Sequence, residues 1–176
     1  DGGYAVGIEI RPDAIFTAVL NLSGQVVATS RDALAANDIN GVTCAVRNAK
    51  LAILNDLGIP DTKLLGAGLV MPGPFGRTGL SGTSSMLSIF DDTSVNDWFS
   101  EALGVGVVVE NDANASAVAE RVSGVAKGFD SFAYLYFGSG LGLGIVENGR
   151  LIGGALGNAG EIGHIPVLAD GQKVSL

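Results

Sequence analysis

The feature that most constrains the fold of this 176-residue chain is a group of three short apolar segments at its start. They are residues Tyr4–Ile10, Ala14–Leu20 and Gln25–Ser30. Their lengths and their alternation of apolar residues are typical of β-strands. The connections between them are too short for a crossover, so neighbouring strands must run antiparallel. We therefore predict an antiparallel meander.

Helices and strands alternate after this meander. Over Ile39–Leu57 the apolar residues recur at spacings of four, three, four and four, which predicts an amphipathic helix that ends at Gly58 and Pro60. The elements predicted next are a strand over Leu64–Val70, a loop over Met71–Pro74 and a helix from Thr93 or Ser94 to Leu103. They are followed by a strand over Val105–Glu110 and a helix that starts at Asn111-Asp112 and runs to about Ser123. The order βββαβαβα is that of a ribonuclease-H-like unit.

A second group of strands follows, predicted at Ser131–Phe137, Leu141–Glu147 and Arg150–Ile152. The last two are joined by Asn148-Gly149, a strong hairpin signal. Because this group begins the first pattern again, we predict a complete first lobe over residues 1–124 and the beginning of a second, truncated lobe over residues 125–176. The second lobe is expected to expose apolar strand surface.

Charge and composition exclude several classes of function. The net charge of −8 repels phosphates, so this chain is not expected to bind DNA by itself. No apolar run approaches the roughly 18–20 residues of a membrane-spanning helix. The single cysteine, Cys44, excludes an intramolecular disulfide and fits a reducing cytoplasm, where we expect the protein.

Four stretches together resemble the ROK family of sugar kinases and sugar-responsive repressors. They are Val6–Ile10, Leu69–Pro74, Val109–Asn114 and Gly157–His164, in the order and at the spacing of the family, and Ser84–Leu87 is similar to a further loop of it. The resemblance covers about residues 4 to 168. It implies an α/β fold of the actin-like ATPase type, in which two ribonuclease-H-like lobes face a cleft.

Asn111 and Asp112 stand where a predicted strand stops and a predicted helix starts. Side chains there project at the carboxyl end of a sheet, where α/β folds bind ligands. In the kinases that the chain resembles, the residue matching Asp112 takes the proton from the attacking sugar hydroxyl. The residue matching Asn111 holds sugar hydroxyls. The alternative is that Asp112 merely caps the helix.

The resemblance implies further ligand contacts. Ser85 and Glu161 match positions that face the sugar. His164 lies three residues after Glu161 and matches a sugar contact in some members and a zinc ligand in many. Gly138, Ser139 and Gly140 resemble the family's second phosphate loop, where backbone N–H groups cradle a phosphate; the alternative is a glycine-rich hairpin corner.

Two departures from the family pattern bear on cofactors. The kinases carry a first loop of the form Asp-x-Gly-Gly-Thr, whereas this chain reads Glu9-Ile10-Arg11-Pro12-Asp13. Arg11 is bulky and Pro12 lacks an N–H donor, so we expect ATP and magnesium not to bind well. The family's cysteine run, which completes a zinc site, does not follow His164, and Cys44 cannot replace it. Zinc is expected only if a longer protein supplies that run.

These observations favour the sugar-binding effector domain of a ROK transcriptional regulator over an enzyme. The start at Asp1-Gly2-Gly3 without Met leads us to expect a DNA-binding helix-turn-helix before it, so that DNA is bound only through a domain outside this chain. A free monosaccharide is the expected ligand, and a homodimer or higher homo-oligomer the expected assembly. The alternatives are an ATP-dependent sugar kinase of the glucokinase or N-acetylhexosamine kinase type, with Asp112 as base, and a structural relic that binds nothing.

Overall fold

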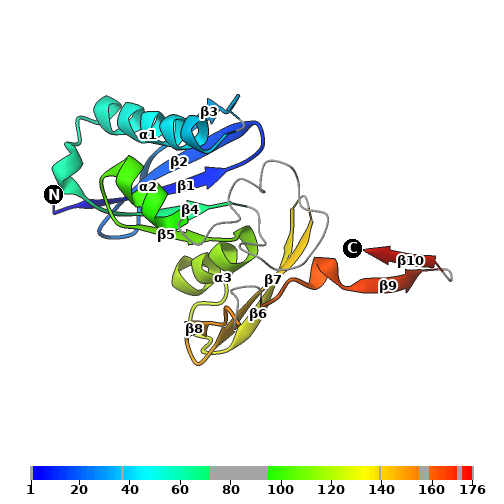
Figure 1. Cartoon of the computed structure of the whole chain (residues 1–176). Coiled ribbons are helices and arrows are strands. Elements are labelled where there is room, and N and C mark those ends of the chain that lie inside the picture. Colours follow the sequence, from blue (N-terminus) through cyan, green and yellow to red (C-terminus); the bar gives the residue numbers. More distant parts are fainter. Residues whose placement is uncertain are drawn as a thin grey trace. The chain divides into compact units, whose positions relative to one another are not determined.

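A five-stranded sheet carries the first half of the chain in the computed structural model (Figure 1). The structure describes residues 2–36, 38–71, 95–138, 140–154, 159–169 and 172–175. Contacts divide these residues into two compact units, one formed by residues 2–71 and 95–110 and the other by residues from 111 onward. The prediction that the lobes span residues 1–124 and 125–176 stays a prediction, and each unit is described by itself below.

The sheet of the first unit has the order β3-β2-β1-β4-β5. Its strands are β1 (Tyr4–Ile10), β2 (Ala14–Asn21), β3 (Val26–Ala33), β4 (Leu64–Val70) and β5 (Val107–Glu110). β1, β2 and β3 form the predicted antiparallel meander, whereas β4 runs parallel to both β1 and β5. The sequence prediction of the meander and of the two later strands is confirmed.

Two helices pack on this sheet and on each other, α1 (Ile39–Asp56) and α2 (Val95–Leu103). The spacing predicted for the apolar face of α1 is confirmed, since its buried residues include Val42, Val46, Ala49 and Ile53. Leu57 closes the helix as its C-cap and is 38% exposed, so it lies at the rim of the core. A short 3₁₀ turn, η1 (Asp61–Lys63), leads from α1 into β4.

Lys50 is a charged residue that lies in this core. It is 2% exposed, and its Nζ donates a hydrogen bond of 3.0 Å to the carboxylate of Asp61 and one of 2.8 Å to the carbonyl oxygen of Leu103. One buried ammonium therefore ties α1 to η1 and to the last residue of α2. The last residues of a helix carry unsatisfied carbonyls, which favour a cation.

The second unit contains α3 (Asp112–Ser123), β6 (Phe132–Phe137), β7 (Leu141–Glu147) and β8 (Arg150–Leu151). These strands form an antiparallel sheet of order β6-β7-β8, which repeats the meander of the first unit as predicted. The turn at Asn148-Gly149 is confirmed, with φ of 49° and 75° as a tight hairpin requires. Leu135 and Phe137 of β6 are 51% and 78% exposed, which confirms the expectation of exposed apolar strand surface.

A 3₁₀ turn, η3 (Ile162–His164), and two further strands follow β8. The strands are β9 (Pro166–Ala169) and β10 (Gln172–Ser175), paired antiparallel. The sequence reading predicted neither of them. No helix in the described part of the chain is long and apolar enough to cross a membrane.

Candidate functional site

The N-terminus of α3 is capped by Asn111. Its backbone is extended, with φ of −75° and ψ of 164°, and its side-chain Oδ1 accepts a 2.7 Å hydrogen bond from the N–H of Asn114. Asn111 is 5% exposed. The alternative reading of Asp112 as the helix cap is therefore wrong, because the neighbouring asparagine has the cap geometry and satisfies the N–H three residues on.

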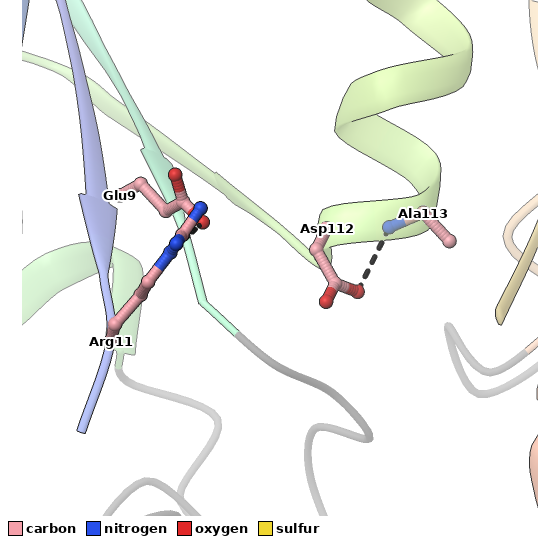
Figure 2. Close-up of polar contacts among 4 residues, drawn as sticks. All are labelled: Glu9, Arg11, Asp112 and Ala113. Carbon is pink, nitrogen blue, oxygen red and sulfur yellow. Dashed lines mark hydrogen bonds and ion pairs between the residues drawn. The ribbon is translucent and has the colours of Figure 1, made fainter. Parts of the chain in front are cut away.

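Asp112 is instead the first residue of α3 and is half-buried. Its Oδ1 accepts a 2.9 Å hydrogen bond from the N–H of Ala113 (Figure 2). A carboxylate in the first turn is stabilised by the positive end of the helix dipole. Because Asn111 fulfils the cap role, Asp112 is not required as the cap, and a ligand role is compatible with its position.

Glu161 lies directly before η3, in the segment that resembles the sugar-contacting part of the family. It is half-buried, and its side chain makes no capping bond to the turn that follows. The turn is closed by hydrogen bonds from the N–H of Ile162 to the carbonyl of Gly160 (2.7 Å) and from the N–H of Ile165 to the carbonyl of Ile162 (3.1 Å). Glu161 is thus the N-cap residue of the turn whose last residue is His164. Of His164, the backbone alone is described.

β7 brings α3 and the Glu161 turn together within the second unit. α3 packs on the face of β7, and η3 contacts the same strand. The N–H of Leu143 in β7 donates a 3.0 Å hydrogen bond to the carbonyl of Gly160, the residue before Glu161. Three of the predicted site residues, Asn111, Asp112 and Glu161, are therefore carried by elements that share one strand.

The turn between β6 and β7 contains Gly138 and Gly140. The N–H of Gly138 donates a 3.0 Å hydrogen bond to the carbonyl of Gly140, so this N–H is used inside the turn. A phosphate loop needs N–H groups that point outward. The described part of this turn favours the hairpin-corner alternative. Ser139 lies outside the described residues, as does Ser85.

The connection between β1 and β2 is a tight turn. The N–H of Arg11 bonds to the carbonyl of Ala14 at 2.8 Å, and the N–H of Ala14 bonds back to the carbonyl of Arg11 at 3.4 Å. Pro12, between them, has no N–H. The residues where the kinases have their first phosphate loop therefore form a closed hairpin turn that directs few donors outward.

The Arg11 side chain folds back along β1. Its Nε donates a 2.7 Å hydrogen bond to Oε1 of Glu9 (Figure 2). Its guanidinium lies 4.7 Å from the centre of the Phe16 ring. Glu9 stands at the position of the aspartate in the kinases' Asp-x-Gly-Gly-Thr loop. Because its carboxylate already has a cationic partner two residues away, a second cation such as magnesium would compete with Arg11 for it.

The residues present do not fit a zinc site. Cys44, the single cysteine, is exposed on α1, where its Sγ accepts weak hydrogen bonds from Arg47 and Asn48. A structural zinc is held by four cysteine or histidine ligands. No group of three or more histidine, cysteine or acidic residues suited to a metal occurs in the described part of the chain.

The sequence reading missed the glycines that hold the site elements against β7. A Cβ placed on Gly142 would lie 2.8 Å from Cβ of Ala113, and one on Gly160 would overlap the carbonyl oxygen of Leu143. The signal in the sequence was the spacing of small residues on two elements. Ala113 and Ala117 are four residues apart on the helix, and Gly142 and Gly144 are two residues apart on the strand. Such spacings place small residues on one face of each element.

Comparison with known proteins is consistent with this fold and these motifs. The family model described as "ROK family" matches residues 5–175. The chain is 28% identical over 173 residues to the xylose repressor of Bacillus subtilis, covering 98% of this chain and 45% of the repressor. It thus spans about half the length of this curated relative.

Two solved structures superpose closely. One is a ROK family glucokinase from Streptomyces griseus in complex with glucose and AMPPNP, with a TM-score of 0.77, 27% identity and coverage of 94% of this chain and 51% of that one. The other is a ROK family transcriptional regulator, a homologue of the E. coli MLC protein, with a TM-score of 0.79, 22% identity and coverage of 97% and 43%. Regulators and kinases are therefore both among its relatives.

Proposed function

We propose that this chain, which belongs to the ROK family, forms the sugar-binding part of a transcriptional regulator. A free monosaccharide would contact Asn111, Asp112 and Glu161, and His164 and Ser85 are proposed as further contacts. DNA would be bound by another part of the full-length protein, and the sugar would shift the relative positions of the two parts. Xylose and glucose, which the names of its relatives mention, are the first ligands to test.

The observation that carries the proposal is the closed turn at Arg11–Asp13. Phosphoryl transfer depends mainly on positioning and neutralising the phosphates, usually with magnesium. Here two backbone N–H groups bond within the turn, a proline removes a third, and Glu9 is paired with Arg11. A general base contributes about 10²–10⁴-fold by itself, which does not compensate for an unbound nucleotide.

A specific observation favours the kinase alternative. Asp112 is half-buried at the start of α3 and is not the helix cap, so its position is compatible with the role of a base toward a sugar hydroxyl. The same carboxylate accepts a hydrogen bond from a bound hydroxyl equally well, because a sensor and a kinase need the same group in the ground state. Asp112 therefore supports sugar binding under both alternatives and does not distinguish them.

Two measurements on the full-length protein test the proposal. Calorimetry with D-xylose, D-glucose and N-acetyl-D-mannosamine should detect binding of at least one. Asp112→Ala should lower that affinity about tenfold to a hundredfold, since a lost hydrogen bond to a charged group costs about 1.5–3 kcal/mol. Asp97→Ala, which removes an exposed carboxylate from the first turn of α2, is the matched control and should leave the affinity unchanged.

A coupled assay with magnesium-ATP and the sugar so identified separates the two functions. We expect no turnover above background. A rate of about 1 s⁻¹ or more lies in the ordinary range of enzymes and would establish the kinase instead. If no sugar binds, or if Asp112→Ala leaves every affinity unchanged, the site assignment is wrong.

A further inference from the structure

We infer that Gly142 and Gly160 are positioning residues, which fix the Asp112 and Glu161 carboxylates relative to each other through β7. This inference rests on the proposed function, because it concerns the geometry of the proposed sugar site. Neither glycine contacts the ligand in this scheme. Each acts by letting a second element come closer to β7 than any side chain would allow.

Gly142 sets how closely the start of α3 approaches β7. A Cβ on this glycine would lie 2.8 Å from Cβ of Ala113, and its next neighbour, Cβ of Tyr136, is 3.9 Å away. Real Cβ atoms essentially never come this close, so a methyl group here must push Ala113 outward. Ala113 follows Asp112 directly and donates its N–H to the Asp112 carboxylate. A displacement of Ala113 therefore moves that carboxylate.

Gly160 sets how closely the Glu161 turn approaches the edge of β7. Its φ of +88° is in the left-handed region that favours glycine, and a Cβ here would overlap the carbonyl oxygen of Leu143. Its carbonyl accepts the Leu143 and Ile162 N–H groups. Since the overlap is with backbone in the middle of a paired strand, the turn must move rather than β7. Glu161, the next residue, moves with it.

The two contacts lie on neighbouring parts of one strand. Gly142 is in β7, next to the Leu143 that bonds Gly160. Any ligand that donates hydrogen bonds to both carboxylates needs them at a fixed separation, because hydrogen bonds weaken outside a narrow range of distance and angle. The strand is paired along its length with β6, which gives the two carboxylates a rigid common support.

The first test is sugar affinity in the full-length protein, measured with whichever of D-xylose, D-glucose and N-acetyl-D-mannosamine it binds. Gly142→Ala and Gly160→Ala should each weaken binding about tenfold, the loss of one hydrogen bond. Adding Ala113→Gly to Gly142→Ala removes the clashing methyl and should restore most of the affinity. Gly128→Ala is the matched control, because Gly128 has a φ of +98° with open space around it. It should bind sugar normally despite comparable backbone strain.

The second test needs no ligand and separates a failure of this inference from a failure of the proposed function. Hydrogen exchange should accelerate in residues 112–117 for Gly142→Ala and in residues 159–165 for Gly160→Ala, and in neither segment for Gly128→Ala. If no sugar binds to the unmodified protein, the proposed function fails and the exchange rates alone decide the positioning claim. Unchanged exchange in both segments, or affinity that Ala113→Gly does not restore, would overturn it.

Discussion

Replacing Lys50 by methionine should destabilise the first unit by about 1–2 kcal/mol. The substitution keeps the unbranched stem that packs in the core and removes the ammonium. The carbonyl oxygen of Leu103 then loses its 2.8 Å hydrogen bond at a buried position, and leaving a buried acceptor unsatisfied costs about 1–3 kcal/mol. Relief from burying a charge offsets part of this cost.

The carboxylate of Asp61 should contribute less to the stability of the first unit than the carbonyl of Leu103 does. The Asp61 side chain is 54% exposed whereas that of Lys50 is 3% exposed, so water screens the carboxylate and rehydrates it when the ammonium is removed. Exposed ion pairs contribute about 0–1 kcal/mol. Asp61→Asn, which keeps an oxygen that can accept from Lys50, should therefore cost less than about 1 kcal/mol and less than Lys50→Met.

Urea unfolding followed by the fluorescence of Trp98 measures both variants. Trp98 is the single tryptophan of the chain and lies on α2, the helix whose last carbonyl Lys50 binds, so its signal reports on the first unit. A midpoint shift at constant slope gives the change in the free energy of unfolding. If Lys50→Met proved as stable as the parent, the buried ammonium would make no net contribution to the free energy of unfolding. The reasoning from the Leu103 carbonyl would then be refuted.

Three further outcomes are expected. Asn111→Ala should lower the free energy of unfolding by about 1 kcal/mol through loss of the cap on α3 while Asn111→Asp costs little, as denaturant midpoints will show. Gly149→Ala should cost about 1 kcal/mol or more in the same assay, because the hairpin holds this residue at a φ of 75°. Replacing Arg11, Pro12 and Asp13 by Gly-Gly-Thr should increase the affinity for a fluorescent ATP analogue, whether or not kinase activity also appears. Unchanged affinity would show that this turn is not what weakens nucleotide binding.

The fold was predictable from sequence wherever burial dictated the pattern. Val42, Val46, Ala49 and Ile53 form the buried stripe of α1 at the predicted spacing, because a helix that packs on a sheet must repeat its apolar residues every three or four positions. The hairpin at Asn148-Gly149 was predictable for a local reason, since few residue pairs adopt two successive left-handed conformations.

The hairpin of β9 and β10 was missed although its sequence carries a signal. Asp170-Gly171 is a turn dipeptide between Pro166–Ala169 and Gln172–Ser175, and the flanking segments are short enough to be strands. The cap of α3 was also missed. Asn111 and Asp112 both favour cap positions, and sequence alone does not locate the first helical residue to within one position.

The candidate site was predictable as a set of residues but not as a geometry. Asn111, Asp112 and Glu161 are identified by motif. Nothing in their spacing indicates that β7 supports both the start of α3 and the Glu161 turn. That geometry depends on Gly142 and Gly160, which have no side chain and so let α3 and the Glu161 turn approach β7 closely. Glycines in this role produce no pattern of apolar residues from which the contact could be predicted. The phosphate-loop interpretation of Gly138 and Gly140 treated glycine as exposed backbone for a ligand, whereas the N–H of Gly138 is bonded inside its own turn.

Under the proposed function, weak nucleotide binding and sugar binding would depend on different elements of this chain. The closed turn at Arg11–Asp13 belongs to the β1–β2 hairpin of the first unit, whereas α3, β7 and η3 belong to the second unit. We therefore expect substitutions in this hairpin to change phosphate binding while the packing of α3 and the Glu161 turn on β7 is kept. Under the proposed function, a change at Gly142 or Gly160 would disturb sugar binding whether the full-length protein is a regulator or a kinase. The Gly-Gly-Thr variant tests this independence, since it should alter nucleotide affinity and leave sugar affinity unchanged.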